Sequence, residues 1–495
     1  MAHLQAALSG TLKGPAKLDA VNELLDKLTE DLKFSTLQPQ ERDAALEELK
    51  IYGREPSYAD PIFTKKGLET LAKFAFESDS DATSRNALRV LCNALFLKPE
   101  TRQMFIDLGY EPKACAKLKN DNRDDEFLIS RLILLTTYGT NINLATLIEE
   151  HQLADSIIQN LSRHAARFSA QTTGEATTDP MEDMALAETL KVIFNVTAFA
   201  KDHLSSFDAA LPHITTILCT HPLPSTSSPL DPPFSLLINA LFNLDLSTPT
   251  AKSALYPSSS PTRVADRLIT LLGLSMKSYT DTNLEQAVTP LVCVISAVYE
   301  HAPTSDATSD NTATGTTTNL DIRAFIRTAL LPTAEDRKTV LGKGDTLPSR
   351  LLRNWTNPLA PQFRKAVAHL YFDLSSKDPA QLVENVGYGY ASGFLFENEI
   401  EVPEGVMKGQ GGGKGEGSSN MGKRPVNPIT GQFLDEESVP DLPKMTMEEK
   451  EREAERLFVL FERLKQTGVI SVQNPVEKAM QEGRIQELPD DEDLD

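Results

Sequence analysis

Cysteine is scarce in this sequence, and the few cysteines lie far apart. The four are Cys92, Cys115, Cys219 and Cys293, and no two of them have the spacing of a zinc-binding or redox pair. Three of them lie in apolar stretches, which is typical of reduced thiols in a hydrophobic core. We therefore expect no disulfide framework and no metal ion, and nothing in the sequence indicates a cofactor.

Long hydrophobic runs are absent as well. No apolar stretch reaches the roughly 18 residues that a membrane-spanning helix requires. The opening residues, MAHLQAALSGTLKG, lack the basic start and the long apolar centre of a secretory signal peptide. We therefore expect a cytoplasmic protein without direct membrane insertion, which a partner could recruit to the plasma membrane or the cell cortex.

Basic residues are in the minority. The chain of 495 residues has 49 lysines and arginines against 70 aspartates and glutamates, which gives a formal net charge of -21. Binding to phosphate groups requires a positive surface. The charge therefore argues against a protein that binds nucleic acids or anionic membranes.

Catalytic signatures are missing too. The sequence has no HExxH or GxSxG motif and no nucleotide-binding fingerprint. The glycine-rich run around Lys414 is not a phosphate loop, because Gly415 follows the lysine where a serine or threonine is needed. We therefore expect a non-catalytic protein that acts by binding.

What the sequence does contain is helical periodicity, from the N-terminus to about residue 400. In the stretch LDAVNELLDKLTEDL, the apolar residues Leu18, Val21, Leu25 and Leu28 recur every three or four positions. This spacing places them on one face of a helix. Strand-type alternation is scarce, so the pattern predicts an all-α fold.

Three helical stretches share one pattern, an apolar run with an asparagine near its end. They read RNALRVLCNALF, LKVIFNVTAF and LLINALFNLDL, and their asparagines are Asn93, Asn195 and Asn243. Three weaker copies have another short polar residue at the same position. We call all six positions the slots; the weaker ones are Thr136, Ser296 and Asp373.

The intervals between slots indicate a repeat architecture. Consecutive slots are about 43 to 77 residues apart, whereas an armadillo or HEAT repeat takes roughly 40–47 residues. Ser/Thr/Pro-rich insertions explain the longer intervals, because they hold too little apolar surface to offset the entropy cost of ordering. The sequence therefore predicts, over residues 1–401, an armadillo/HEAT-like right-handed superhelical solenoid with disordered loops.

The slots have two interpretations that the sequence leaves open. In such a solenoid, one helix of each repeat lines the inner, concave wall, so slot residues could bind a peptide there. Alternatively, they only bridge neighbouring helices. Residues four or eight positions earlier share the same helix face, and Arg85, Arg89, Lys191 and Asn239 occupy these positions. They would extend the slots into a strip that suits an acidic peptide, or they are an ordinary solvated face.

The composition changes after residue 401. Residues 402–444 are rich in glycine and proline, which is typical of a flexible linker. Thr446 and Glu449 then form a capping box, and the pattern predicts an amphipathic docking helix over 445–468, followed by an acidic tail over 469–495. The helix has one apolar stripe, which would dock on the solenoid or on a partner. The residues of this stripe are Leu457, Leu460, Phe461 and Leu464.

Several of these segments resemble one known family. They read NALRVLCNALF, EFLISRLILLTTYG, ALAETLKVIFNVTAF, LVENVGYGYASGFL, VNPITGQ and MTMEEKEREAERLFVLFERL. In this order, between about residues 70 and 467, they resemble the synembryn family, which comprises guanine nucleotide exchange factors and folding chaperones of heterotrimeric G-protein α subunits. Animal members carry an acidic Ser/Thr cluster before the NPITG segment. This chain has a glycine-rich run there, which indicates a fungal member.

The resemblance implies a partner and two contacts. Family members are armadillo/HEAT superhelices that hold the C-terminal helix of the α subunit in the concave groove. They use their own C-terminal helix, here Thr446 to Gln466, against its nucleotide-binding domain. We therefore expect a monomer that binds GDP-bound and nucleotide-free α subunits. The groove candidates carried over from the family are Arg85, Arg89, Asn93, Arg131, Lys191, Asn195, Asn239 and Asn243.

The alternative is an armadillo-type scaffold or adaptor that binds an unrelated peptide. An import adaptor of this kind would show tryptophans at a regular distance from its asparagines, and Trp355 is the only tryptophan of the chain. A simple peptide groove also needs no second docking helix. The sequence therefore favours the exchange factor.

Overall fold

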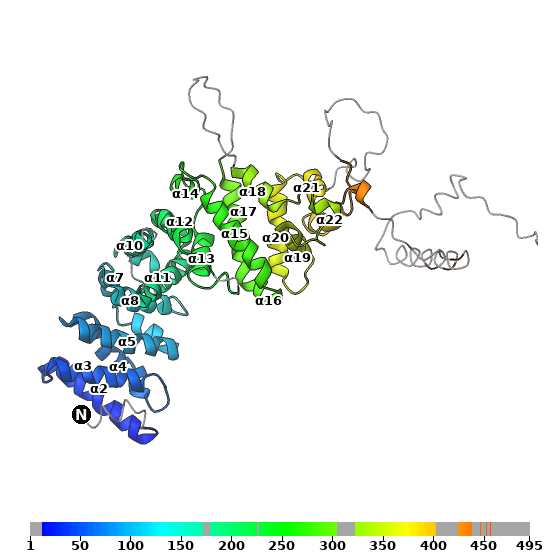
Figure 1. The fold of residues 1–495 in the computed structure, drawn as a ribbon. Coiled ribbons are helices and arrows are strands. Elements are labelled where there is room, and N and C mark those ends of the chain that lie inside the picture. Colours follow the sequence, from blue (N-terminus) through cyan, green and yellow to red (C-terminus); the bar gives the residue numbers. More distant parts are fainter. Residues whose placement is uncertain are drawn as a thin grey trace, which may run out of the picture. The chain divides into compact units, whose positions relative to one another are not determined.

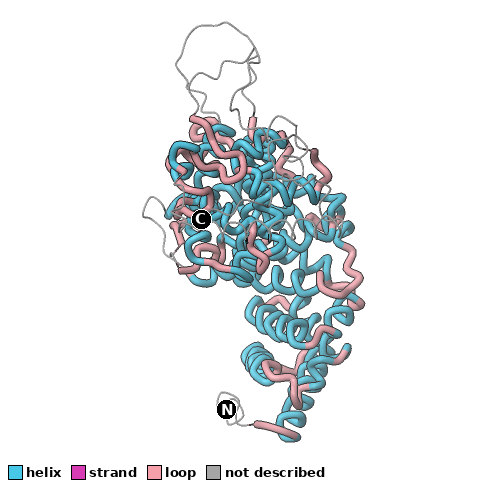
Figure 2. Tube along the Cα trace, turned by 90° about the vertical axis from the view of Figure 1, so that its right-hand side faces the viewer, coloured by secondary structure: helices cyan, strands magenta, loops and turns pink. Residues whose placement is uncertain are grey.

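The computed structural model describes residues 12–171, 179–224, 227–303, 322–401 and 424–437, together with Thr446, Arg452 and Arg456. The chain divides into two compact units, Met1–Glu436 and Glu437–Asp495. The structural description below concerns the first unit. Within its described ranges the regular structure is helical, and the only β-type pairing is a single bridge between Val426 and Phe433 (Figures 1 and 2). The prediction of an all-α solenoid is confirmed.

Each predicted slot lies on its own helix, and these helices form one row. Each of them packs against the next one in chain order (Figure 1). We call them the slot helices. Their bounds are α5 (Asp81–Leu97), α8 (Arg123–Thr136), α11 (Pro180–Phe199), α13 (Phe234–Asn243), α17 (Thr289–His301) and α20 (Pro361–Leu374).

A second row of helices covers one side of the slot helices. Its members also pack in chain order, and each one contacts the slot helix that follows it. This arrangement of two layers buries apolar side chains from both rows in a continuous core. The second row consists of α7 (Glu111–Leu118), α10 (Leu153–Gln171), α12 (Leu211–Thr220), α15 (Arg263–Ser278) and α19 (Leu347–Trp355).

The remaining helices extend the array at both ends or connect its rows. At the N-terminal end, α3 and α4 pack on α5, and at the C-terminal end α21 packs on α20. The α-helices of this group are α2 (Pro15–Phe34), α3 (Pro39–Tyr52), α4 (Lys65–Glu77), α6 (Glu100–Ile106), α9 (Leu144–Glu149), α14 (Pro249–Leu255), α16 (Asp281–Asn283), α18 (Ile322–Leu330), α21 (Pro379–Val386) and α22 (Tyr388–Glu397). The short helices of other types are η1 (Asp60–Phe63), η2 (Lys201–Ala210), η3 (Leu284–Val288), η4 (Asp336–Lys338) and η5 (Leu434–Glu436).

Capping residues explain where several of these helices begin. The side chain of Ser80 accepts a hydrogen bond from the backbone N–H of Thr83 at the start of α5. Asn122 accepts from the N–H groups of Asp124 and Asp125 at the start of α8. Each such cap stabilises its helix by about 1 kcal/mol, because it satisfies a backbone donor that the helix leaves unpaired.

The cysteines behave as core residues. All four are free; Cys92 and Cys115 are buried, whereas Cys219 and Cys293 are partly exposed. Burial raises the pKa of the Cys92 and Cys115 thiols to about 12. Neither thiol is therefore reactive at neutral pH.

The boundary of the solenoid differs from the one expected. Residues 424–436 belong to the same compact unit as the helical array, so the predicted linker over 402–444 is interrupted by a packed segment. Residues 172–178, 304–321 and 402–423 fall largely within the predicted Ser/Thr/Pro-rich insertions and the predicted linker, and they lie outside the described residues. The predicted helix over 445–468 lies outside them too, apart from Thr446, Arg452 and Arg456.

Candidate partner-binding surface

Most slot side chains bridge consecutive slot helices. The amide nitrogen of Asn195 on α11 donates a 2.9 Å hydrogen bond to the hydroxyl of Thr137, which follows α8. Asn243 on α13 donates across 2.9 Å to the carbonyl oxygen of Phe194 on α11. On the next pair, the hydroxyl of Ser296 on α17 donates to the carboxylate of Asp373 on α20. Four of the six slots therefore join one repeat to the next, whereas the hydroxyl of Thr136 donates to the carbonyl oxygen of Ile133 within α8 itself.

The first slot also lacks a bridge in the described part of the chain. Asn93 is half-buried, and no hydrogen bond of its side chain is found among the described residues. Asn195, by contrast, is only 6% exposed. Asn239 is half-buried too, and no hydrogen bond of its side chain is found among the described residues either, whereas Asn195 serves the internal bridge.

The expected basic strip is matched by acidic residues, which lie on the next slot helix for Arg85, Arg89 and Arg131 and on the same helix for Lys191. Arg85 on α5 lies 2.9 Å from the carboxylate of Asp125 on α8, and Arg89 lies 3.3 Å from Asp124. One repeat further along, Arg131 and Lys191 lie 3.6 Å and 3.0 Å from the carboxylate of Glu188. We call these residues the charge ladder.

Three cationic side chains of the charge ladder remain partly exposed to solvent. Arg89, Arg131 and Lys191 keep 35%, 40% and 39% of their side-chain surface exposed. The guanidinium of Arg131 also lies over the ring of Phe127, 5.1 Å from its centroid. An acidic group of a partner can therefore contact these three cations while their internal partners hold them in position.

Asp125 is the most buried acid of the charge ladder. Burial alone would raise the pKa of its carboxyl, but hydrogen bonds from Arg85 and Asn120 and the charge of Lys117 lower the pKa below its usual value. The carboxylate is therefore charged at neutral pH, and it ties α5 to α8.

Exposed aromatic side chains follow the same end of four consecutive slot helices. They stand at or just beyond the C-terminal ends of α5, α8, α11 and α13, and between 46% and 63% of each residue's surface is exposed. Large exposed aromatic residues in a row are typical of a protein-binding surface. We call this row the aromatic edge; it consists of Phe96, Tyr138, Phe199 and Phe242.

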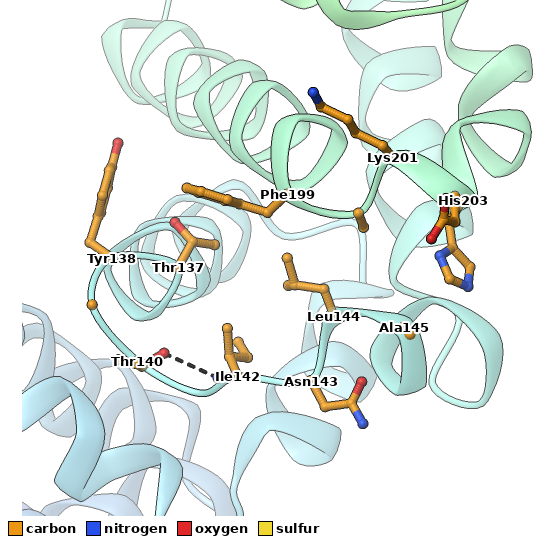
Figure 3. Close-up of a pocket in the computed structure, with 13 residues that line it drawn as sticks. Thr137, Tyr138, Thr140, Ile142, Asn143, Leu144, Ala145, Phe199, Lys201 and His203 are labelled. Carbon is orange, nitrogen blue, oxygen red and sulfur yellow. Dashed lines mark hydrogen bonds between the residues drawn. The ribbon is translucent and has the colours of Figure 1, made fainter.

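Two hollows lie along the aromatic edge. A pocket of about 500 Å³ opens between the ends of α8 and α11. Figure 3 shows Tyr138 and Phe199 on one side of this pocket and Lys201 and His203 on the other. A second hollow of about 230 Å³ between α13 and α17 is lined by Phe242 and His301. Both could accept apolar side chains of a partner.

Sequence reasoning found the slots but missed the aromatic edge. Phe96 and Phe199 follow their slot asparagines by three and four positions. This recurrence of an aromatic residue shortly after the asparagine was the signal in the sequence that could have revealed the aromatic edge. It also missed the acidic half of the charge ladder. The acids that face Arg85 and Arg131 lie 40 and 57 positions further along the chain, so only the packing of α5, α8 and α11 brings them together.

The apolar stripe of the predicted docking helix is not part of the described structure. Leu457, Leu460, Phe461 and Leu464 lie outside the described residues. Within the described part of the chain, no cluster of three or more His, Cys, Asp or Glu side chains is arranged to hold a metal ion. Among the same residues, no helix has both the length and the apolar character needed to cross a membrane.

Comparison with known proteins agrees with the sequence motifs. A family model described as guanine nucleotide exchange factor synembryn matches residues 45–484. A synembryn-like chaperone of Schizosaccharomyces pombe is 33% identical over 171 residues, which cover 33% of this chain and 32% of that protein. Ric-8A chaperones of Macaca fascicularis and Bos taurus are 25% and 26% identical, and they cover 93% and 90% of this chain and 89% and 85% of their own.

The family match includes all six slot helices, the packed segment 424–436 and the predicted docking helix. It therefore does not depend on the repeat pattern alone, which unrelated helical solenoids share. The chain belongs to the synembryn family of guanine nucleotide exchange factors.

Proposed function

We propose that this protein is a guanine nucleotide exchange factor and folding chaperone for G-protein α subunits. Family membership and the chaperone names of its relatives support this function. The observation on the chain itself that carries the proposal is the aromatic edge, because it places an exposed aromatic side chain at the C-terminal end of each of four consecutive slot helices.

The spacing of this surface suits a helical ligand. Packed helices lie about 8–10 Å apart, so the aromatic residues recur at about that interval. A ligand helix presents side chains seven residues apart at intervals of about 10.5 Å. A helix with apolar residues every seventh position can therefore contact one aromatic residue of the edge after another, as the C-terminal helix of an α subunit would.

The charge ladder would add orientation to this contact. Arg89, Arg131 and Lys191 are half-exposed on α5, α8 and α11. A bound helix whose acidic side chains or terminal carboxylate face these cations would form charge-assisted hydrogen bonds. The same helix bound in the opposite direction would lose them. The cations therefore contribute to the direction of binding more than to its strength.

Exchange then follows from differential binding. The protein need not touch the nucleotide, because tighter binding to the nucleotide-free α subunit lowers the affinity of that subunit for GDP by the same factor. A shift from 1:99 to 99:1 requires a difference in binding free energy of about 5.5 kcal/mol between the two states. Withdrawing the C-terminal helix of the α subunit onto the slot helices would supply part of this difference.

The predicted helix over 445–468 would supply a second contact. Because it is part of the same chain, its binding is intramolecular once the groove is occupied, and its contribution depends on effective concentration. The same two contacts would cover apolar surface of a newly made α subunit before it binds nucleotide, and this is the chaperone function.

The direct test is GDP release from a purified α subunit. We expect the full-length protein to accelerate release, and we expect a chain truncated after Glu437 to bind the α subunit but accelerate release less. A protein that binds many unrelated helical peptides and leaves GDP release unchanged would instead be a scaffold.

A further inference from the structure

A packed hairpin follows the glycine-rich run. Residues 424–436, which we call the strap, fold back on themselves: the N–H of Asn427 donates to the carbonyl of Gln432 across 2.8 Å, and the N–H of Gly431 donates to the carbonyl of Asn427 across 2.9 Å. Arg424 lies over the ring of Phe433, 4.2 Å from its centroid. The strap is thus a defined structural element within the region expected to be a linker.

The strap caps one helix of the array. The backbone carbonyls of Pro428 and Ile429 accept hydrogen bonds of 2.7 Å and 3.0 Å from the N–H groups of Tyr388 and Gly389. These are donors of the first turn of α22, which has no side-chain cap. The strap lies beside α22 as the orange segment of Figure 1.

On its other side the strap binds the segment around η4. The guanidinium of Arg337 donates to the carbonyl of Gly431 across 2.9 Å, and to the carbonyls of Glu384 and Asn385 near the end of α21. The N–H of Phe433 donates to the carbonyl of Arg337 across 2.8 Å. Arg337 therefore joins three parts of the chain, and the strap closes the end of the array.

Glycines make this close packing possible. Gly431 has a φ of +69°, and a Cβ atom there would lie 2.3 Å from the side chain of Leu341. Gly387 has a φ of +81°, and its Cβ would lie 2.7 Å from the carbonyl oxygen of Ile429. Because both positions combine a positive φ with a close backbone or side-chain neighbour, larger residues would expel the strap.

We propose that the strap sets the length of the connection between the slot helices and the C-terminal docking helix. With the strap bound, that connection starts at Glu437, and residues 402–423 do not contribute to its length. This inference rests on the proposed two-contact function. It assigns to the strap a positioning role, because the strap limits the volume in which the docking helix searches for the α subunit.

The size of the effect follows from chain statistics. About 20 residues separate Glu437 from the apolar stripe that starts at Leu457, whereas about 56 separate Glu401 from it. Effective concentration falls as about the 3/2 power of connection length. Release of the strap would therefore lower the effective concentration of the docking helix by about fivefold.

Insertions on the two sides of the strap test the proposal, because they leave the residues of the strap itself unchanged. One variant carries about 40 Gly/Ser residues between positions 410 and 411, and a matched variant carries the same insertion between 440 and 441. The measurement is the Kd for the purified nucleotide-free α subunit, with thermal unfolding as the check on folding. We expect no change for the upstream insertion and about fivefold weaker binding for the downstream one.

A third variant releases the strap. We expect the upstream insertion, when it is combined with Gly431→Val, to weaken binding about twofold relative to Gly431→Val alone. The reason is that residues 402–423 then belong to the connection. Gly393→Val is the matched control, since a Cβ at Gly393 on α22 has no neighbour within 4 Å. Hydrogen exchange at Tyr388 and Gly389 reports whether the strap has left α22.

The outcomes separate the inference from the function on which it rests. Equal weakening by both insertions, or no weakening by either while truncation after Glu437 still weakens binding, would overturn the role of the strap. If truncation after Glu437 leaves the Kd unchanged, the second contact itself is wrong. Loss of binding in Gly431→Val that does not depend on insertion length would mean that the strap only stabilises the fold.

Discussion

The slot residues differ in what their side chains bind. Asn195 and Asn243 donate to neighbouring slot helices, and Ser296 and Asp373 bond to each other. Asn93 has no such partner among the described residues. The sequence could show that one position recurs with a short polar residue, but not which residues face a helix end, because that depends on the offset between packed helices.

The bridge made by Asn195 predicts a stability effect. Asn195→Ala removes the hydrogen bond to Thr137 and leaves a small gap between α8 and α11, so we expect about 1 kcal/mol of lost stability. Asn239→Ala, at a half-exposed position, is the control and should change stability by less than about 0.5 kcal/mol. Thermal unfolding of both variants measures the difference. Equal melting temperatures would contradict the internal bridge.

The carboxyl of Asp125 predicts a pH dependence. Its pKa is lowered in the folded protein. Its contribution to stability is therefore fully present above the unfolded pKa of about 3.9 and is lost as the pH falls through the folded pKa. We expect Asp125→Asn to destabilise the protein at pH 7, and the deficit to shrink below about pH 4. Asp81→Asn, with an exposed side chain, is the matched control; a deficit that grows on acidification would contradict the assignment.

At the scale of elements, the row of slot helices was predictable and its surface was not. The asparagine pattern located α5, α11 and α13, and the weaker copies located α8, α17 and α20. The charge ladder and the aromatic edge depend on which helix faces which, and no local pattern encodes that. The strap was visible only as the motif VNPITGQ, because its hydrogen bonds to the rest of the array join residues that lie 40 to 96 positions apart in the chain.

The aromatic edge predicts a binding effect without a folding effect. Phe199 is 62% exposed beside the larger pocket, so Phe199→Ser should leave the melting temperature unchanged and weaken α-subunit binding at least tenfold. Phe34→Ser is the matched control, because Phe34 is 69% exposed at the end of α2. Pulldown or calorimetric titration measures the affinity of each variant for the α subunit. Equal loss of affinity in both variants would show that the aromatic edge is not part of the binding surface.

At the scale of the whole molecule, the chain consists of a stack of helices, which includes the strap, and a second compact unit, Glu437–Asp495. The stack offers the aromatic edge and the half-exposed cations of the charge ladder. Because repeat proteins are stabilised by contacts between neighbours, changes at the edge or in the strap should leave distant repeats intact. This separation allows the two proposed contacts to be tested one at a time.

The most direct test of the account is the affinity for one purified α subunit in two states, nucleotide-free and GDP-bound. The account predicts that the full-length protein binds the nucleotide-free state at least about a hundredfold more tightly, since the difference in affinity is what drives GDP release. Equal affinity for the two states would contradict it, however tight the binding, because a protein that does not distinguish the states cannot shift the equilibrium between them.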